Sequence, residues 1–193
     1  MKKIYMLITL FLATFLLSAC KSDENPVVTM HIQDIGTMKI ELYPEVAPNT
    51  VNNFIKYIED GFYDGVGFHR VIENFVIQGG QNPDLNTRCA IEGEFLANGF
   101  ENSKTHSRGV ISMARTNDPN SATSQFFIVH RNAPHLDENY AAFGVLIEGY
   151  DVLDIIATTE TGPQDRPVED IIIQNATVEL NGYKPDEVVC YQR

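Results

Sequence analysis

The sequence has no tryptophan, only three cysteines, and a small share of basic residues. Its 193 residues include 14 Lys+Arg against 26 Asp+Glu, which gives a formal net charge of -12 at pH 7. Nucleic-acid phosphates repel a chain of this charge, so we expect no nucleic-acid partner. The cysteines form no CxxC pair and the five histidines show no metal-ligand spacing. We therefore expect no metal site.

The single long apolar run stands at the N-terminus, where Lys2 and Lys3 precede uncharged residues from Ile4 to Leu17. As a helix these fourteen residues would rise only ~21 Å, short of the ~30 Å hydrocarbon core of a bilayer. This pattern predicts a signal peptide rather than a permanent membrane span.

The residues Leu17-Ser18-Ala19-Cys20 resemble the bacterial lipobox, in which the cysteine is acylated (for example with palmitate) and becomes the first residue after cleavage. The resemblance implies an envelope protein held on a bacterial membrane, outside the cytoplasm, by the lipid on Cys20. The alternative is an ordinary secretory peptide with an incidental cysteine. The sequence does not say whether the cell has one membrane or two.

The composition, with 44% hydrophobic and 21% charged residues, is typical of one globular domain, which we expect to be a monomer. Oxidation is permitted in an exported protein, so a disulfide between the remaining Cys89 and Cys190 is possible, but the sequence does not decide it. We expect four segments: a signal peptide (1–19), the lipidated cysteine with a short tether (20–26), the folded domain (27–183) and a tail (184–193).

Hydrophobic patterning predicts a mainly β domain. A helix is expected from Asn49 to Asp60, where the apolar residues fall at i, i+3, i+4 and i+7, and another from Tyr150 to Ala157. Many short antiparallel strands with an early and a late helix favour a closed eight-stranded antiparallel β-barrel capped by two α-helices. The expected strands are Val27–Ile32, Thr37–Tyr43, Phe68–Ile72, Val76–Gln78, Val110–Ala114, Gln125–Val129, Ala141–Ile147 and Ile171–Leu180.

Polar residues alternate with large apolar ones on several of these strands. In Ser124-Gln125-Phe126-Phe127-Ile128, period-2 alternation puts Gln125 and Phe127 on one face and Phe126 and Ile128 on the other. Arg70 and Gln78 sit in similar settings. For each residue alone, the simpler interpretation is a polar side chain facing water or a scattered surface apolar group. Three such faces together indicate an open surface that carries amide, cation and aromatic ring.

The motifs that contain these residues resemble the signatures of the cyclophilins, in the same order and spacing, over about residues 27–180. The resemblance implies a cyclophilin-like barrel with a substrate groove on its outside. It also implies peptidyl-prolyl cis-trans isomerase activity (EC 5.2.1.8), which assists the folding of exported or envelope proteins without a cofactor. The matching motifs are Phe68-His69-Arg70-Val71-Ile72, Phe75-Val76-Ile77-Gln78-Gly79-Gly80, Gly109-Val110-Ile111-Ser112-Met113-Ala114, Ser124-Gln125-Phe126-Phe127-Ile128 and Phe143-Gly144.

The resemblance also implies the roles of the groove residues. Arg70 matches the catalytic arginine, and Phe75, Gln78 and Phe127 complete the catalytic set. The substrate-binding positions are matched by Val76, Ala114, Arg115, Gln125, His135, Leu136 and Tyr140.

Four of these positions depart from the best-known eukaryotic form. Val76 stands where Met is usual, Arg115 where Asn is usual, and Tyr140 where His is usual, as in bacterial members. His135 replaces the usual Trp, which puts contacts at that position in doubt.

Two other functions stay open at this point. Ser124, His130 and Asp137 contain the residue types of a hydrolase triad, but Ser124 lacks a G-x-S-x-G setting. Alternatively, the groove could grip proline-containing segments as a binding module without turnover. An assay on a short X-Pro peptide distinguishes this last possibility from an enzyme.

Overall fold

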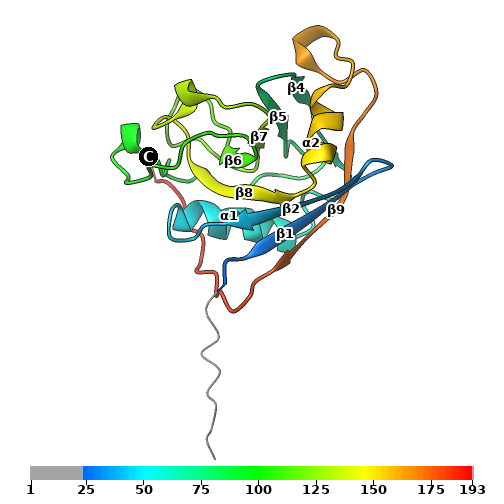
Figure 1. Ribbon diagram of the computed structural model, residues 1–193. Coiled ribbons are helices and arrows are strands. Elements are labelled where there is room, and N and C mark those ends of the chain that lie inside the picture. Colours follow the sequence, from blue (N-terminus) through cyan, green and yellow to red (C-terminus); the bar gives the residue numbers. More distant parts are fainter. Residues whose placement is uncertain (1–23, 193) are drawn as a thin grey trace, which may run out of the picture.

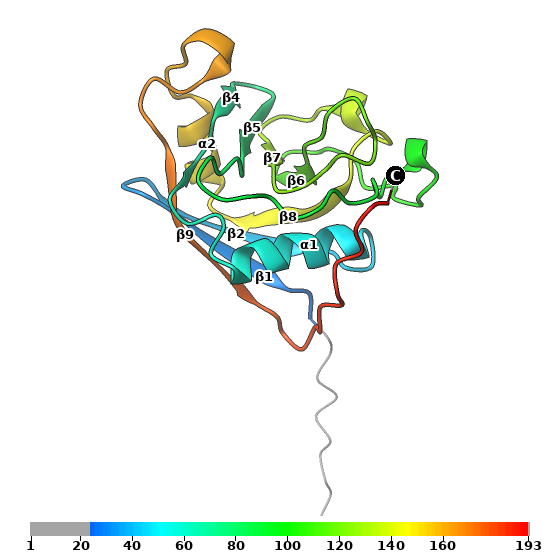
Figure 2. The same ribbon diagram turned by 180° about the vertical axis from the view of Figure 1, so that it is seen from behind.

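One antiparallel sheet of nine strands, curled around a core and accompanied by two α-helices, dominates the computed structural model (Figures 1 and 2). The structure describes residues 24–192. The predicted signal peptide, Cys20 and most of the predicted tether lie outside the described residues.

The elements follow the predicted order closely, with short 3-10 turns between them. The α-helices are α1 (Pro48–Glu59) and α2 (Tyr150–Ala157), and the 3-10 turns are η1 (Leu96–Asn98), η2 (Pro134–Leu136) and η3 (Pro163–Asp165). The strands are β1 (Val27–Ile32), β2 (Gly36–Leu42), β3 (Val66–Gly67), β4 (Arg70–Ile72), β5 (Val76–Gly79), β6 (Val110–Met113), β7 (Phe126–Val129), β8 (Ala142–Glu148) and β9 (Ile172–Glu179).

The prediction of a closed eight-stranded barrel was wrong in strand number and in closure. The sheet order is β3-β9-β1-β2-β8-β6-β7-β5-β4, and within residues 24–192 no ladder joins its two ends. The extended segment changes its hydrogen-bonding partner between Phe68 and His69. The Phe68 N–H donates to the Ile171 carbonyl, whereas the His69 N–H donates to the Gln78 carbonyl. Because its partner changes, this segment forms two short strands, β3 and β4, which lie at opposite ends of the sheet order. The sheet is an open, curled half-barrel.

The two faces of the sheet carry separate apolar clusters, as the period-2 pattern of β7 predicts. Phe126 and Ile128 belong to the large core inside the curl. Phe127 and Val129 belong to a smaller cluster on the outer face, which also includes Val76, Val110, Ala133, Leu136 and Ala142. A second apolar surface outside the barrel is therefore available to build a pocket.

Helix α1 is packed against the sheet by the predicted residues Val51, Phe54, Ile55 and Ile58, all of which are buried. Pro48 occupies its first turn, where the missing N–H is no loss. The helix ends at Glu59, and Gly61 just beyond it has the left-handed conformation (φ 66°) that commonly follows a helix.

The turn between β1 and β2 has positive φ angles at two residues. Asp34 has a φ of 59° and Gly36 a φ of 156°. Glycine is required at position 36 because a Cβ there would lie 2.8 Å from a methyl carbon of Val152 on α2.

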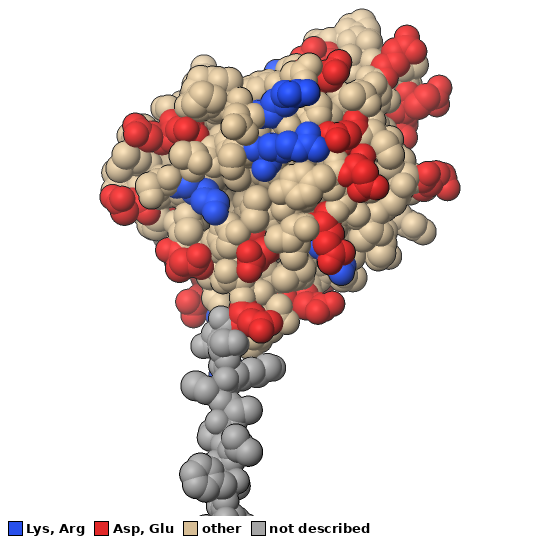
Figure 3. All heavy atoms as spheres, in the orientation of Figure 1, with Lys and Arg blue, Asp and Glu red and all other residues tan. Residues whose placement is uncertain are grey.

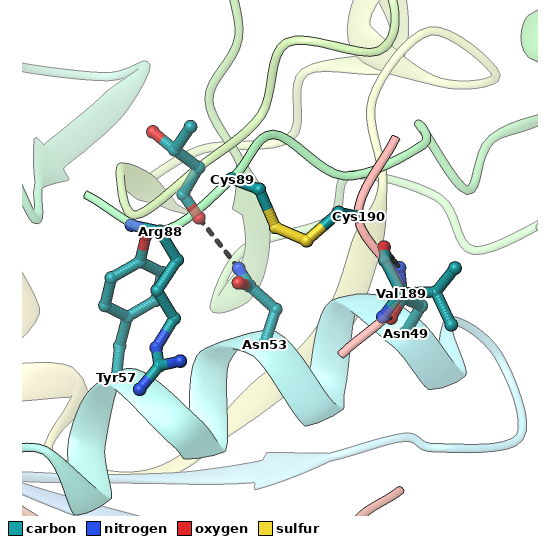
Figure 4. The surroundings of a disulfide bond; sticks show 8 residues. Asn49, Asn53, Tyr57, Arg88, Cys89, Val189 and Cys190 are labelled. Atoms are coloured by element: carbon teal, nitrogen blue, oxygen red, sulfur yellow. Dashed lines mark hydrogen bonds between the residues drawn. A yellow bond between two sulfur atoms is a disulfide. The ribbon is translucent and has the colours of Figure 1, made fainter. Parts of the chain in front are cut away.

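A disulfide joins Cys89 to Cys190, whose Cα atoms are 5.6 Å apart and which are 101 positions apart in sequence. It ties the C-terminal segment to the loop beside α1 (Figure 4). Asn49 on α1 reinforces this attachment, because its side chain exchanges two 2.9 Å hydrogen bonds with the backbone of Val189. The C-terminal tail is therefore fastened to the folded domain at two neighbouring positions.

Carboxylates are spread over the face of the molecule seen in Figure 3, with fewer basic groups between them. Among the described residues, no helix is long and apolar enough to cross a membrane.

Candidate functional site

Four residues on adjacent strands stand in one row on the outer face of the sheet. Arg70 on β4 is paired in register with Gln78 on β5, and Gln78 with Phe127 on β7. Phe127 is in turn paired with Ser112 on β6. Directly paired residues share a face of the sheet, so the strand register itself places cation, amide and aromatic ring side by side.

A cavity of about 380 Å³ lies over this row. Ten of the eleven groove residues suggested by the sequence line it: Arg70, Phe75, Val76, Gln78, Ala114, Arg115, Phe127, His135, Leu136 and Tyr140. The eleventh, Gln125, is attached to the lining, because its side-chain oxygen accepts a 3.0 Å hydrogen bond from the Gln78 amide.

Aromatic rings form the walls of the cavity. The ring of Tyr140 meets Phe127 edge-on, with centroids 5.6 Å apart and an interplanar angle of 83°. His135, which is exposed, stacks on Phe75 at 5.2 Å. The ring-lined part of this cavity suits a compact apolar group such as a proline ring.

Arg115 forms a rim of the cavity rather than a free cation. Its guanidinium lies 4.6 Å from the centroid of the Tyr140 ring and 5.2 Å from that of Phe95. It also donates hydrogen bonds of 2.9 and 3.2 Å to the Asn139 carbonyl. The neighbouring Ala114 N–H donates to the Gln125 carbonyl and so is occupied within the protein.

His106, which the sequence did not single out, supports Phe127 from below. The two rings are stacked with centroids 5.9 Å apart, and the histidine is buried. Its Nδ1–H donates to Asp137 Oδ1 at 3.0 Å, and Nε2 accepts from the Ser112 hydroxyl at 3.2 Å. Burial lowers the pKa of His106, although the hydrogen bond to Asp137 opposes this shift. The contact with Asp137 is therefore a hydrogen bond from a neutral ring rather than an ion pair.

Arg70 has an ion-pair partner that the sequence did not indicate. Its Nε lies 3.4 Å from Asp165 Oδ2, and the two side chains are 38% and 47% exposed. Asp165 ends the short turn η3, almost a hundred positions further along the chain. No local pattern could have identified this contact.

The residues of the conceivable hydrolase triad are not brought together. The Ser124 hydroxyl donates to the Gly80 carbonyl, His130 contacts Asp154, and Asp137 contacts His106. Across residues 24–192, no group of three or more His, Cys, Asp or Glu is arranged to hold a metal ion.

The assembled site can hold an apolar ring in its aromatic cavity with one guanidinium and one amide beside it. The hydroxyl in this row, that of Ser112, donates to His106 Nε2, but Ser112 and His106 are buried and are not among the residues that line the cavity, so the cavity itself presents no activated nucleophile. It is suited to a reaction in which charge redistributes in the substrate without a covalent bond being formed or broken.

Comparisons with known proteins agree with this geometry. Residues 27–178 match the family model "Cyclophilin type peptidyl-prolyl cis-trans isomerase/CLD". A peptidyl-prolyl cis-trans isomerase of Arabidopsis thaliana is 38% identical over 156 residues, covering 80% of this chain and 96% of the plant protein. One from Streptomyces antibioticus is 39% identical over 156 residues, covering 74% of this chain and 93% of its own.

Solved structures give the same result. The crystal structure of a cyclophilin type peptidyl-prolyl cis-trans isomerase from Cryptosporidium parvum superposes with a TM-score of 0.72 at 27% identity, covering 80% of this chain and 98% of its own. A second structure of that protein, in the presence of the dipeptide Ala-Pro, gives a TM-score of 0.71 at 27% identity, covering 79% and 98%.

Proposed function

The chain belongs to the cyclophilin-type peptidyl-prolyl cis-trans isomerases (EC 5.2.1.8), and we propose that it acts, with Arg70 as its catalytic cation, on X-Pro bonds of exported or envelope proteins. The proposal is carried by the row of Arg70, Gln78 and Phe127 beside an aromatic cavity of about 380 Å³. A related isomerase has been crystallised in the presence of the dipeptide Ala-Pro. This observation supports proline-containing peptides as substrates of the present chain.

The electronic structure of the peptide bond explains why a guanidinium would be useful. Rotation about the C–N bond faces ~18–20 kcal/mol, because resonance gives that bond partial double-bond character. As the bond twists, the lone pair becomes localised on the prolyl nitrogen. A cation beside that nitrogen stabilises the twisted state more than the planar one, which is what lowers the barrier.

The remaining groove residues would supply orientation. Phe75, Phe127, Leu136 and Tyr140 hold the proline ring and exclude water, which strengthens the field of Arg70. Gln78, whose amide is fixed by Gln125, would hold one side of the rotating bond while the other turns.

The first test is Arg70→Ala. Removing a donor that acts on the transition state typically raises the barrier by about 2.7–4 kcal/mol, so kcat/KM should fall roughly a hundred- to a thousandfold. The reaction is isomerisation of an X-Pro peptide, followed by exchange NMR. Stability should barely change, because Arg70 is partly exposed and outside the core.

Arg88→Ala is the matched control, because Arg88 pairs with Asp60 away from the groove. It should leave turnover unchanged. Full activity of a folded Arg70→Ala protein would overturn the proposed role of Arg70. A wild-type protein that binds the peptide without turning it over would favour the binding-module alternative.

The cellular setting is part of the same proposal: Cys20 is acylated and holds the enzyme on a bacterial membrane, outside the cytoplasm. Two observations support it. The Cys89–Cys190 disulfide belongs to the kind of bond that persists in oxidising compartments. In both ribbon views, β4 and β5 lie at the end of the molecule away from the start of β1 (Figures 1 and 2). An anchor before β1 would thus lie at the opposite end from the groove and leave the groove accessible to substrate proteins.

Replacing Cys20 by alanine tests the anchor. The wild-type protein should partition into the detergent phase of Triton X-114 and the Cys20→Ala variant into the aqueous phase. Cys89→Ala is the control, because it removes a cysteine without touching the lipobox. Equal partitioning of wild type and Cys20→Ala would contradict lipid anchoring.

A further inference from the structure

We propose that Asp165 is a positioning residue for catalysis, which holds the Arg70 guanidinium in the orientation that the twisted peptide bond requires. The inference rests on the proposed role of Arg70. It begins from the ion pair between Arg70 Nε and Asp165 Oδ2, which are 3.4 Å apart.

The site of attachment on the guanidinium supports a positioning role. Asp165 approaches Nε, and it is the single ion-pair partner of Arg70 among residues 24–192. Both terminal nitrogens are thus left for a substrate in the cavity that Arg70 lines. A long arginine side chain is otherwise free to turn about several bonds, so a carboxylate at Nε reduces the orientations that the guanidinium samples.

The backbone presents Asp165 at an energetic cost. Gln164 and Asp165 both have left-handed backbones, with φ angles of 64° and 60°, where side chains are disfavoured. The loop is closed by a 2.8 Å hydrogen bond from the Gly162 N–H to the Arg166 carbonyl and by a β-bridge between Thr161 and Pro167. A glycine would adopt this conformation freely. Aspartate adopts it more readily than most other residues, and here this backbone brings the carboxylate to Arg70.

Residues of η3 also line a second hollow beside the groove. A second hollow, of about 440 Å³, is lined by His69, Arg70, Gln81, Gln164, Asp165 and Arg166. Arg70 lines both this hollow and the aromatic cavity, so Asp165 lies beyond Arg70 as seen from the proline pocket. It can hold the arginine without obstructing the proline ring.

The Asp165 carboxylate has two opposing effects on the reaction, one on the electric field of Arg70 and one on the orientation of its guanidinium. It offsets part of the positive field that Arg70 exerts, but both side chains are more than a third exposed, so water screens this effect. Orientation acts directly on the reacting bond, where small displacements strongly reduce the rate. We therefore expect the positioning effect to dominate and Asp165 to accelerate the reaction.

The test measures kcat and KM separately for Asp165→Asn. An exposed ion pair is worth at most about fivefold in an equilibrium, so kcat should fall about three- to fivefold while KM for an X-Pro peptide changes less than twofold. Asp165→Glu keeps the charge and should recover part of kcat. Asp170→Asn is the matched control, because it removes the same charge from the same loop at a residue that pairs with Arg166 instead. It should be as active as wild type.

A double-mutant cycle separates positioning from a general structural effect. Asp165→Asn should have no effect in an Arg70→Ala background, because there is then no guanidinium to orient. The same fall of kcat in both backgrounds, or wild-type kcat in Asp165→Asn, would overturn the inference. Wild-type activity of Arg70→Ala would instead overturn the proposed function, and the inference with it.

Discussion

At the scale of single residues, the groove is supported by side chains that never face the substrate. His106 is the clearest case, because it stacks on Phe127 and its ring nitrogens contact Asp137 and Ser112. A protonated His106 would lose the acceptor that the Ser112 hydroxyl uses. A neutral, buried histidine thus packs behind Phe127, a wall of the proline pocket.

The pKa of His106 leads to a prediction about stability and pH. Burial lowers this pKa in the folded protein below its ordinary value of 6.5. The unfolded chain therefore binds a proton more readily, so the stabilisation is fully present above about pH 6.5 and is lost as the pH falls below it. We expect the free energy of unfolding in urea to fall between pH 7 and pH 5, and to fall less steeply in His106→Gln.

His31→Gln is the control, since His31 is exposed and hydrogen-bonded only to Thr37 among the described residues. It should keep the wild-type slope. Burial also lowers the pKa of His69, so the His106→Gln slope should not vanish. Identical slopes for wild type and His106→Gln would contradict this account.

At the scale of elements, the β4–β5 hairpin is held in place from below by β7 and α2. The Asn74 N–H at its turn donates to His130 Nδ1 at 2.9 Å, and the His130 N–H donates to the Phe75 carbonyl at 2.8 Å. His130 Nε2–H in turn donates to Asp154 Oδ1 on α2 at 3.0 Å. A buried histidine thus joins three elements just behind Phe75, a wall of the proline pocket.

Replacing His130 by alanine should loosen this hairpin. The substitution should lower the free energy of unfolding by about 1–3 kcal/mol, because the Asn74 N–H loses its acceptor, whereas Asp154 keeps its contact with Arg108. KM for an X-Pro peptide should rise as the Phe75 wall becomes mobile. Urea unfolding and steady-state kinetics measure the two effects.

Arg131→Ala is the comparison, because Arg131 is exposed and its side chain donates to the side chain of Asn74 rather than to the backbone of the turn. Its effect on both quantities should be small. If His130→Ala were no less stable than Arg131→Ala, the hairpin would not depend on the buried histidine.

At the scale of the whole molecule, the C-terminal segment acts as a strap across α1. The Tyr183 hydroxyl donates to Asn52 at 2.6 Å, the Tyr191 N–H donates to the Ala90 carbonyl at 2.8 Å, and Cys190 is bonded to Cys89. These attachments, of which Figure 4 shows the disulfide, join the end of the chain to the first helix and to the middle of the sequence.

Reduction of this disulfide should destabilise the protein without impairing the groove. In the chain-entropy account, closing a loop of about 100 residues stabilises the fold by roughly 4–5 kcal/mol, an upper value because residual structure in the unfolded chain reduces it. The urea midpoint of the wild type should fall when a reductant is added, whereas that of Cys89→Ser/Cys190→Ser should be low and insensitive to it. Isomerase activity under native conditions should be unchanged. A midpoint independent of reductant in the wild type would rule out this contribution.

The sequence by itself determined the features that depend on neighbouring residues. The alternation of Phe126 and Ile128 with Phe127 indicated which face of β7 is core, and the apolar spacing in α1 indicated which face is buried. Both follow from the fixed periods of strand and helix, which any short segment displays. The lipobox is equally local, but it lies outside the described residues. The groove residues could be named from the motifs, and the strand register then accounts for their proximity.

The tertiary structure decided whatever joins distant parts of the chain. The N-terminus of α1 is capped by the buried Glu94, whose carboxylate accepts hydrogen bonds of 3.0 and 2.7 Å from the N–H groups of Asn49 and Thr50. The additional strand β3 with its pairing to β9, the Cys89–Cys190 pairing and the contact of Asp165 with Arg70 are of the same kind. Each depends on how far the sheet curls and which loops that curvature brings together. The curvature arises from packing the whole core, so no short segment of sequence encodes it.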